Sequence, residues 1–440
     1  MSFWLLTCAA MSVGHAQSLG IKTAVELRFP TVAGQGYRVL ESDTLGNWQP
    51  MGHQLFGDGT DVSLLIPGSV SARFFRLDTF NVSNLNSVLE PLRVAYNIPA
   101  LACAVVLSNR IAALGAVGWR KSAITNAPVT CGDKWHLGSL TKSMTATLAA
   151  IMVEQGYIKW TNTLADVFPD FASQMDPAWW GATLELLTVN RGGAPQNIPT
   201  NIWNDLTLFG GTPRDARHQL LQQMTTNPPS STPGTMYEYS NAGFALAGHM
   251  LETVANQPWE DLLAAKLFAP LGFSSFGYGV PSTPRYLNQP WGHYLSDPAS
   301  PPSDTNPAWP VDASPNADNP PAIGPAGTVH CCVIDLANYA AFHLAVHKGD
   351  TALLSQASGL KLHTAYPNNG GYAYGWVVLY RSWANGNALW HNGSNGLWYS
   401  EIWLAPQRDF AVVTLCNIGG DAAAFAADDA AAQMIQIFLP

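Results

Sequence analysis

Alternating hydrophobic and polar positions dominate the first part of the chain. In residues 23–79 the alternation appears in short runs such as 25–29, 37–40 and 72–77, separated by glycine, asparagine, aspartate and proline. A period of two is typical of β-strands, and these residue types favour the turns between them. We therefore predict a small β-sandwich-like module over residues 20–80, followed by a polar linker at residues 81–86.

The rest of the chain changes period several times. Apolar runs at 102–107 and 111–117 predict a hairpin, whereas residues 88–96 and most of 139–270 have helical spacing. Residues 281–325 contain twelve prolines and predict a long loop. Strand-like runs at 374–380, 388–391, 397–404 and 410–416 precede an alanine-rich helix at 421–438. The pattern predicts an α/β (α+β) domain over residues 83–440, in which helices flank one antiparallel sheet built from both ends and a helical subdomain is inserted.

The N-terminus has a pattern of its own. Residues 3–13 form an apolar block, and Gly14-His15-Ala16 offers small residues for a signal peptidase. We expect residues 1–16 to be a signal peptide and the protein to be exported, either periplasmic or extracellular; the alternative is a buried N-terminal strand. Cleavage would leave an odd number of cysteines, which argues against a disulfide scaffold, although the neighbours Cys331 and Cys332 leave oxidation open.

Composition and charge exclude several classes of function. The 440 residues are 47% hydrophobic and 12% charged, and the formal net charge is −9. An acidic chain lacks the basic surface that nucleic acid requires. Beyond the N-terminus no run approaches 18 apolar residues, so we expect no transmembrane segment. The sequence leaves the oligomeric state open.

A serine and a lysine precede an apolar helical stripe. Ser139 is followed three positions later by Lys142, and residues 144–152 have helical spacing. Side chains three apart lie on one helix face, so the lysine amine can reach the serine hydroxyl and act as its base if its pKa is lowered. The alternative is a serine N-cap with the lysine on a solvated face, since this short pattern also arises by chance.

Two further patterns bring groups that complement such a pair. Tyr239 and Asn241 flank a candidate N-cap, where a phenol can relay a proton and an amide can hold an amine. His391 and Gly393 end a strand-like run, and the backbone N–H of Ser394 is a candidate oxyanion donor. Either pattern is short: Tyr366-Pro367-Asn368 also fits the first, and His136-Leu137-Gly138 also fits the second.

Taken together and in this order, the three motifs resemble those of the class C β-lactamase and DD-peptidase superfamily, which includes the family VIII carboxylesterases. Further matching stretches are Leu186-Leu187-Thr188, Pro233-Gly234, Trp291-Gly292-His293, Gly324-Pro325-Ala326-Gly327 and Tyr374-Gly375-Trp376. The resemblance covers roughly residues 83–440 and implies a penicillin-recognising-enzyme fold with its cleft between the α/β and helical parts.

The resemblance also implies roles for single residues. Ser139 would be the acylated nucleophile, Lys142 its base, Tyr239 the proton relay and Asn241 the residue that orients the lysine. The N–H groups of Ser139 and Ser394 would form the oxyanion hole.

The chain departs from the family pattern in two places. His391 stands where class C β-lactamases have lysine, and a neutral imidazole binds a carboxylate less strongly than an ammonium group does. Residues 188–193 replace the more usual His-Thr-Ser-Gly, and we expect Arg191 to be a surface charge rather than an anchor at the cleft rim.

From these residues we expect an exported serine hydrolase that acts on esters or D-amino-acid peptides through an acyl-enzyme. Its partner would be a small-molecule or peptide substrate, and the chemistry needs no cofactor. A β-lactamase is the first alternative, and a weakly catalytic or non-catalytic binding or sensor protein of the same fold is the second. His343 and His347 have the spacing of some zinc ligands, but no third ligand is visible, so we expect no metal. Trp291, Trp309, Trp390 and Trp398 are candidates for an apolar subsite, although core packing is the commoner use of tryptophan.

Overall fold

The computed structural model describes residues 24–45, 48–57, 59–67, 73–108, 110–314 and 317–439. The expected signal peptide at residues 1–16 lies outside them. Within the described part of the chain, no helix is both long and apolar enough to cross a membrane. The described cysteines are free thiols, and Cys331 and Cys332 are both buried.

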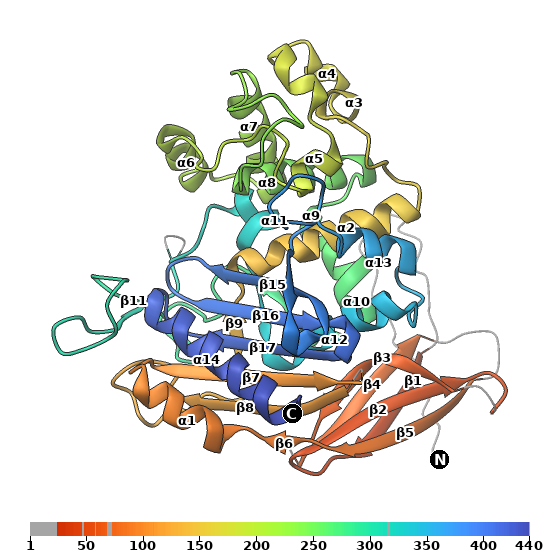
Figure 1. The fold of residues 1–440 in the computed structure, drawn as a ribbon, viewed down its shortest axis with the longest axis vertical. Helices are drawn as coiled ribbons and strands as arrows, with labels where there is room; N and C mark the ends of the chain where they lie inside the picture. Colours follow the sequence, from red (N-terminus) through yellow and green to blue (C-terminus); the bar gives the residue numbers. More distant parts are fainter. Residues whose placement is uncertain are drawn as a thin grey trace, which may run out of the picture.

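A seven-stranded sheet forms the centre of the molecule (Figure 1). Its strands, in sheet order, are β14 (Val377–Arg381), β15 (Gly386–Ser394), β16 (Tyr399–Ala405), β17 (Phe410–Cys416), β7 (Ala100–Leu107), β8 (Arg110–Gly118) and β6 (Ser83–Asn84). The predicted fold class is confirmed, because both ends of the domain supply strands and helices flank them. The sheet is mixed rather than wholly antiparallel, since β6 pairs in parallel with β8.

Both faces of the sheet are covered, which explains why β7 and β17 are apolar throughout. One set of alternating side chains packs against α1 (Asn86–Ala95) and α14 (Asp421–Phe438), and the other set faces α12 (Val333–Lys348) and the main core. Because successive side chains of a strand point to opposite faces, each face gains its own hydrophobic cluster. The long helix α14 lies across the sheet in Figure 1.

The helical part lies above one edge of the sheet in Figure 1. Its helices are α3 (Leu164–Val167), α4 (Pro169–Ala172), α5 (Leu184–Thr188), α6 (Thr200–Thr207), α7 (Pro213–Thr225), α8 (Asn241–Ala255) and α9 (Trp259–Leu263). Between it and the sheet lies α2 (Thr141–Glu154), whose residues from Thr141 to Met152 are all buried. The sequence pattern predicted burial of one face of this helix, whereas these turns are buried on every side.

The proline-rich stretch contains more structure than we expected. It holds the short strands β11 (Gly292–Tyr294) and β12 (Trp309–Val311), which pair with each other, and it begins α11 (Gly324–Gly327). Further short elements are α10 (Ala269–Leu271), α13 (Gln356–Leu362) and the sheet of β10 (Gly277–Tyr278), β13 (Val329–Cys332) and β9 (Lys134–His136). β12 itself contains Pro310, opposite His293 of β11, which is possible because proline is tolerated on an edge strand.

The described residues between 24 and 81 form β-strands. Its strands are β1 (Ala24–Pro30), β2 (Gln35–Ser42), β3 (Gln49–Phe56), β4 (Asp61–Pro67) and β5 (Phe74–Asn81). β1 pairs with β4, and β2 lies between β3 and β5. The division of the chain into domains at 20–80 and 83–440 stays a prediction.

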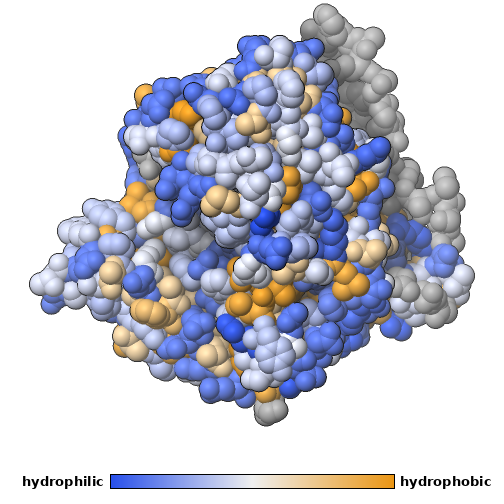
Figure 2. All heavy atoms as spheres, turned by 45° about the horizontal axis from the view of Figure 1, so that its top comes forward, coloured by the Kyte–Doolittle hydropathy of each residue, from blue (hydrophilic) through white to orange (hydrophobic). Residues whose placement is uncertain are grey.

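Most of the surface in Figure 2 is hydrophilic, with hydrophobic residues in a small central group and at scattered positions. The large exposed hydrophobic side chains likewise come from separate elements, for example Leu208 after α6, Tyr286 in the proline-rich stretch and Tyr380 on β14. Single exposed hydrophobic residues of this kind are normal in globular proteins.

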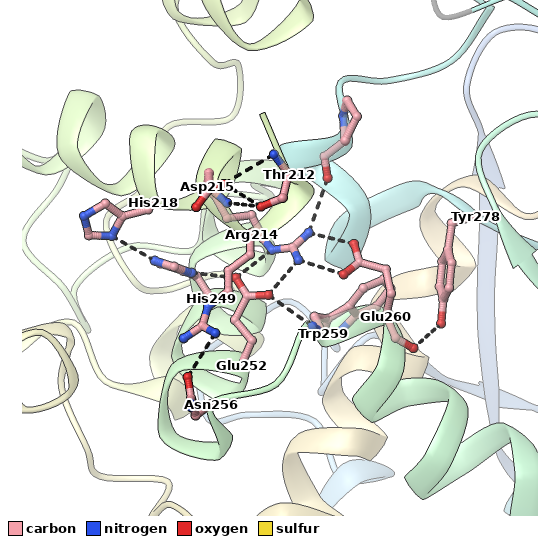
Figure 3. A network of polar contacts seen from close by, with 12 residues as sticks. Thr212, Arg214, Asp215, His218, His249, Glu252, Asn256, Trp259, Glu260 and Tyr278 are labelled. Carbon is pink, nitrogen blue, oxygen red and sulfur yellow. Dashed lines mark hydrogen bonds and ion pairs between the residues drawn. The ribbon is translucent and has the colours of Figure 1, made fainter. Parts of the chain in front are cut away.

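A buried charge network ties the helical part together (Figure 3). The guanidinium of Arg217 on α7 binds both oxygens of Glu252 on α8, at 2.9 and 2.6 Å, and both oxygens of Glu260 on α9, at 2.9 Å each. His249 lies 2.6 Å from the same Glu252 carboxylate. Burial alone would raise the pKa of Glu252, but the hydrogen bonds from His249 and Arg217 lower it to about 2. The carboxylate is therefore charged at neutral pH and depends on these partners.

Removing the arginine should destabilise the fold. We expect Arg217→Ala to lower the free energy of unfolding by about 3–5 kcal/mol, because Glu252 would be left buried without its cation. Arg214→Ala is the matched control: it lies in the same helix, and its bond to Asn256 is exposed. That variant should change stability by less than about 0.5 kcal/mol. Urea unfolding at pH 7 measures both, and equal effects would contradict this role of the network.

Candidate active site

Ser139 lies in a 3₁₀ turn, Gly138–Leu140, that leads directly into α2. The turn is fixed from behind, because the N–H of Leu137 donates to Val329 of β13 and the N–H of Val329 donates to the hydroxyl of Thr141. The Ser139 side chain is only half-buried. The fold therefore presents this hydroxyl at the rim of an otherwise enclosed helix.

The amine of Lys142 is the most enclosed polar group of the site. The residue is 0% exposed, and its Nζ lies 3.0 Å from Ser139 Oγ, 2.6 Å from Asn241 Oδ1 and 2.8 Å from the carbonyl oxygen of Ala326. In the described part of the chain it has no carboxylate ion-pair partner. Burial lowers the pKa of Lys142 to about 7, so both protonation states are populated near neutral pH.

The neighbours of Lys142 decide where its lone pair points. A neutral amine has two N–H donors and one lone pair. The carbonyl oxygens of Asn241 and Ala326 accept hydrogen bonds only, so they take the two N–H groups. The lone pair is then left for the hydroxyl of Ser139, which is the arrangement of a nucleophile with its base.

Tyr239 and Asn241 enter the site from the start of α8. Ser240 caps this helix by accepting a hydrogen bond from the N–H of Gly243, so the residues on either side of it are held at the helix entry. The Tyr239 ring lies 4.7 Å from Lys142 Nζ. Burial raises the pKa of Tyr239, and its contact with Ser139 offsets only part of this rise. The phenol is therefore protonated at neutral pH and can donate a proton.

His391 on β15 faces Tyr239 across the site. Its ring centre is 6.3 Å from that of Tyr239 and 6.2 Å from that of Tyr372. Its Nδ1 lies 2.5 Å from the carbonyl oxygen of Asn392, which places the proton on Nδ1 and the lone pair on Nε2. Burial and the positive charge of Lys142 lower the pKa of His391 to about 4. The imidazole is thus neutral over the physiological pH range.

The end of β15 presses directly against the serine turn. A methyl group on Gly393 would lie 2.0 Å from the carbonyl oxygen of Leu137 and 2.6 Å from the nitrogen of Ser139. A methyl group on Gly138, whose φ is +49°, would lie 2.4 Å from the nitrogen of Ser394. Glycine at both positions lets the two backbones approach, and this approach brings the N–H groups of Ser139 and Ser394 into one region.

The structure therefore brings together Ser139, Lys142, Tyr239, Asn241, His391, Gly393 and Ser394, although their roles stay predictions. The competing Tyr366 packs its ring near Arg191 instead. Sequence reasoning missed the Ala326 carbonyl and Tyr372. Both lie in or beside stretches that matched the family, 324–327 and 374–376, and a backbone acceptor leaves no signal in a side-chain pattern.

The prediction for Arg191 was wrong. The side chain is only 9% exposed, and its guanidinium donates to the carbonyl oxygens of Gly234, Thr235 and Asn368. It is neither a surface charge nor a free anchor for a carboxylate, since carbonyls from two loops occupy its donors. Backbone acceptors can satisfy a buried guanidinium without any acidic residue.

The candidate tryptophans lie in different surroundings, and the ring of Trp291 lies 3.9 Å from Lys121 Nζ. Trp390 packs with Trp403 on the α14 side of the sheet, because it neighbours His391 on a strand and points the opposite way. Trp398 is fully buried against His136, and Trp309 is exposed near a cavity lined by residues such as Arg93 and Asn97. Core packing therefore accounts for Trp390 and Trp398.

His343 and His347 lie beside a third histidine that the sequence did not reveal. His343 Nδ1 is 2.8 Å from His363 Nε2, and the rings of His347 and His363 stack at 5.9 Å. Burial lowers the pKa of each of the three. Across the residues that the structure describes, no group of three or more histidine, cysteine or acidic side chains is arranged to hold a metal ion.

Comparison with known proteins agrees with this geometry. The profile of the family described as Beta-lactamase matches residues 85–435. Penicillin-binding protein 4 of Amycolatopsis lactamdurans is 25% identical over 360 residues, which are 79% of this chain and 88% of that protein. The unguisins hydrolase ungD' of Aspergillus campestris is 23% identical over 318 residues, 68% of this chain and 55% of the relative. The octameric penicillin-binding protein homologue from Pyrococcus abyssi has a similar fold, with a TM-score of 0.64 and 20% identity over 80% of this chain and 76% of that one.

The contact between the two backbones can be tested with one methyl group. We expect Gly393→Ala to lower the free energy of unfolding by about 1–3 kcal/mol, because the added carbon would overlap the serine turn. Gly210→Ala is the control, since a methyl group there meets nothing within 4 Å. Chemical denaturation of both variants gives the comparison. If Gly393→Ala is as stable as Gly210→Ala, the two segments are not in contact.

Proposed function

Since this chain belongs to the β-lactamase family of serine hydrolases, we propose that it cleaves esters or D-amino-acid peptides through an acyl-enzyme on Ser139. The observation that carries the proposal is the amine of Lys142, buried one helical turn from the serine with its lone pair left for the hydroxyl. A serine hydroxyl is a weak nucleophile unless an adjacent base accepts its proton.

In the proposed acylation step, Ser139 Oγ forms a bond to the substrate carbonyl carbon while its proton moves to Lys142 Nζ. The carbonyl oxygen becomes an oxyanion, which the N–H groups of Ser139 and Ser394 would stabilise. As the bond to the leaving group breaks, Tyr239 donates a proton to that group. Lys142 then returns its proton to Tyr239. In the second half of the reaction, the oxygen of a water molecule bonds to the acyl carbon while one proton of that water moves to the relay of Tyr239 and Lys142. The bond from the acyl carbon to Ser139 Oγ then breaks, the relay returns the proton to Oγ, and the acid product leaves.

The electrostatics of the site support substrates without a carboxylate beside the scissile bond. His391 is neutral because of its lowered pKa, and the donors of Arg191 are held by backbone carbonyls. Neither residue is placed to give a substrate carboxylate a positive partner. β-Lactams carry such a carboxylate, so this arrangement favours esters and internal D-peptide bonds over β-lactams.

The relatives leave room for each of these substrate classes. One is named as a penicillin-binding protein and another as a hydrolase of unguisins. β-Lactamase activity is therefore the first alternative, as the family's own name implies. A binding or sensor protein that is acylated but turns over slowly is the second. Export, with residues 1–16 as the signal peptide, belongs to the proposal as well.

A substrate panel tests the proposal. We expect p-nitrophenyl butyrate or a C-terminally amidated D-Ala-D-Ala peptide, neither of which has a carboxylate beside the scissile bond, to be turned over at least tenfold faster than nitrocefin, and Ser139→Ala to abolish turnover. Intact-mass spectrometry should show a transient acyl adduct on the wild type and none on the variant. Faster turnover of nitrocefin would contradict the proposal and favour a β-lactamase. Stoichiometric labelling without turnover would contradict it and favour a binding or sensor protein.

The pH dependence should report Lys142. Its amine is a base only when it is neutral, and burial lowers its pKa to about 7. The rate of acylation should therefore be low at pH 5 and rise with a midpoint near pH 7. Lys142→Arg is the matched variant, because a guanidinium keeps its proton throughout this range. It should lose about 10²-fold or more in rate at every pH. An acylation rate in the wild type that stays flat from pH 5 to 9 would contradict the lysine as base.

A further inference from the structure

A buried acid and imidazole lie behind the serine turn, outside the groups assigned to chemistry. His136 is 0% exposed, and its Nε2 lies 3.0 Å from the carboxylate of Asp318, whose side chain is 7% exposed. Its other ring nitrogen, Nδ1, lies 3.1 Å from the backbone nitrogen of Gly138. His136 thus connects Asp318 to the residue immediately before Ser139.

The contacts fix the proton on this imidazole. The N–H of Gly138 can only donate, so Nδ1 must present its lone pair to it. Nε2 then carries the proton and donates to Asp318. In this tautomer the ring receives a hydrogen bond from the serine turn on one side and gives one to the carboxylate on the other.

The same carboxylate also holds the opposing segment. Asp318 Oδ1 accepts a hydrogen bond from Asn395 Nδ2 at 3.1 Å, and Asn395 Oδ1 accepts one from the N–H of Leu397. Asn395 follows Ser394, whose nitrogen would lie 2.4 Å from a methyl group on Gly138. One carboxylate therefore joins two backbone segments that touch each other and supply the two candidate oxyanion donors.

A separate contact, which does not involve Asp318, also holds these two segments together. The hydroxyl of Ser400 donates to the carbonyl oxygen of Leu137 at 2.7 Å and lies 3.3 Å from that of Gly393. The fold of the site therefore has its own brace. The hydrogen bonds of His136 and Asp318 to the two segments come in addition to this brace.

We propose that Asp318, His136 and Asn395 form a positioning network that sets the spacing and direction of the Ser139 and Ser394 N–H groups. The inference rests on the proposed function, because it assigns these N–H groups to the oxyanion. The three residues are positioning residues: they act through the backbone of the turn and of β15. Oxyanion stabilisation depends on donors fixed in place before the reaction, so a small displacement of either N–H reduces the rate.

Asp318→Asn is the sharpest test. The new amide has one acceptor and one donor end, whereas His136 and Asn395 both donate to this position. Whichever way the new amide lies, its NH2 group faces the donating N–H of His136 or of Asn395 in place of an oxygen, so at least one of these contacts is weakened, with almost no change in volume. Asp312→Asn is the matched control, since Asp312 lies in the same stretch and accepts an exposed N–H from Arg285.

The readout is the affinity for an alkylboronic acid, which forms a tetrahedral adduct with a serine and places an oxygen where the oxyanion would lie. We expect Asp318→Asn to lower kcat and boronate affinity by a similar factor of about 10–100, with KM changed less than threefold. The midpoint of the pH profile should stay near that of the wild type. A merely structural role would lower the melting temperature and leave the boronate affinity of the folded protein unchanged.

A second variant keeps the test valid if Asp318→Asn does not fold. His136→Asn places an amide oxygen close to the position of Nδ1, where it can accept from Gly138, but the shorter side chain does not reach Asp318. If the network acts as one unit, His136→Asn should lose as much boronate affinity as Asp318→Asn, and the double variant should lose no more than either. Additive losses, or variants within twofold of Asp312→Asn, would overturn the inference.

The failure of the proposed function would look different. A wild-type protein that neither binds the boronate nor is acylated by any ester, D-peptide or β-lactam would refute the function and the inference together. The other outcome is a wild type that is acylated at Ser139 and binds the boronate. If the Asp318→Asn and His136→Asn variants then do both equally well, the positioning network alone is refuted.

Discussion

The site depends on a lysine amine that is buried among carbonyl oxygens and, among the residues the structure describes, forms no ion pair with a carboxylate. An ammonium group in such a place is costly, and burial lowers the pKa of Lys142 to about 7. The fold provides this environment by enclosing α2 between the sheet and the helical part, so that Asn241 from α8 and Ala326 from α11 meet over the same atom. The chemistry is therefore a consequence of the packing. A more solvated α2 would leave an ordinary charged lysine beside an ordinary serine.

Much of the fold follows from the period of the hydrophobic pattern. The runs at 102–107, 111–117 and 410–416 became β7, β8 and β17, and the alanine-rich pattern became α14, because burial on each face imposes its own spacing. The short pieces were harder. β6, β11 and β12 are two or three residues long and pair with strands elsewhere in the chain, so no local period reveals them.

The candidate site shows the same division. Three motifs placed seven residues in one region, because each motif stands at the end of a helix or strand and those ends meet. The sequence did not reveal the carbonyl partners of Lys142 and Arg191, since any residue type supplies a carbonyl. The sequence also did not reveal the contacts of His136, because His136-Leu137-Gly138 was read only as a second match to the short motif of His391. Its partner Asp318 is far along the chain, and only the folded backbone brings the two together.

The glycine contacts between the serine turn and β15 have a consequence for how the protein is made. Ser139 emerges early during synthesis, whereas Gly393 and Ser394 belong to one of the last strands to leave the ribosome. Contacts between such remote segments form late in folding, after the cost of closing a very long loop has been met. A nascent or truncated chain that ends before β15 therefore lacks the segment that packs against the serine turn and the N–H of Ser394, which we propose as the second oxyanion donor. Under the proposed mechanism, hydrolysis would therefore begin only after β15 has been made and has packed against the serine turn.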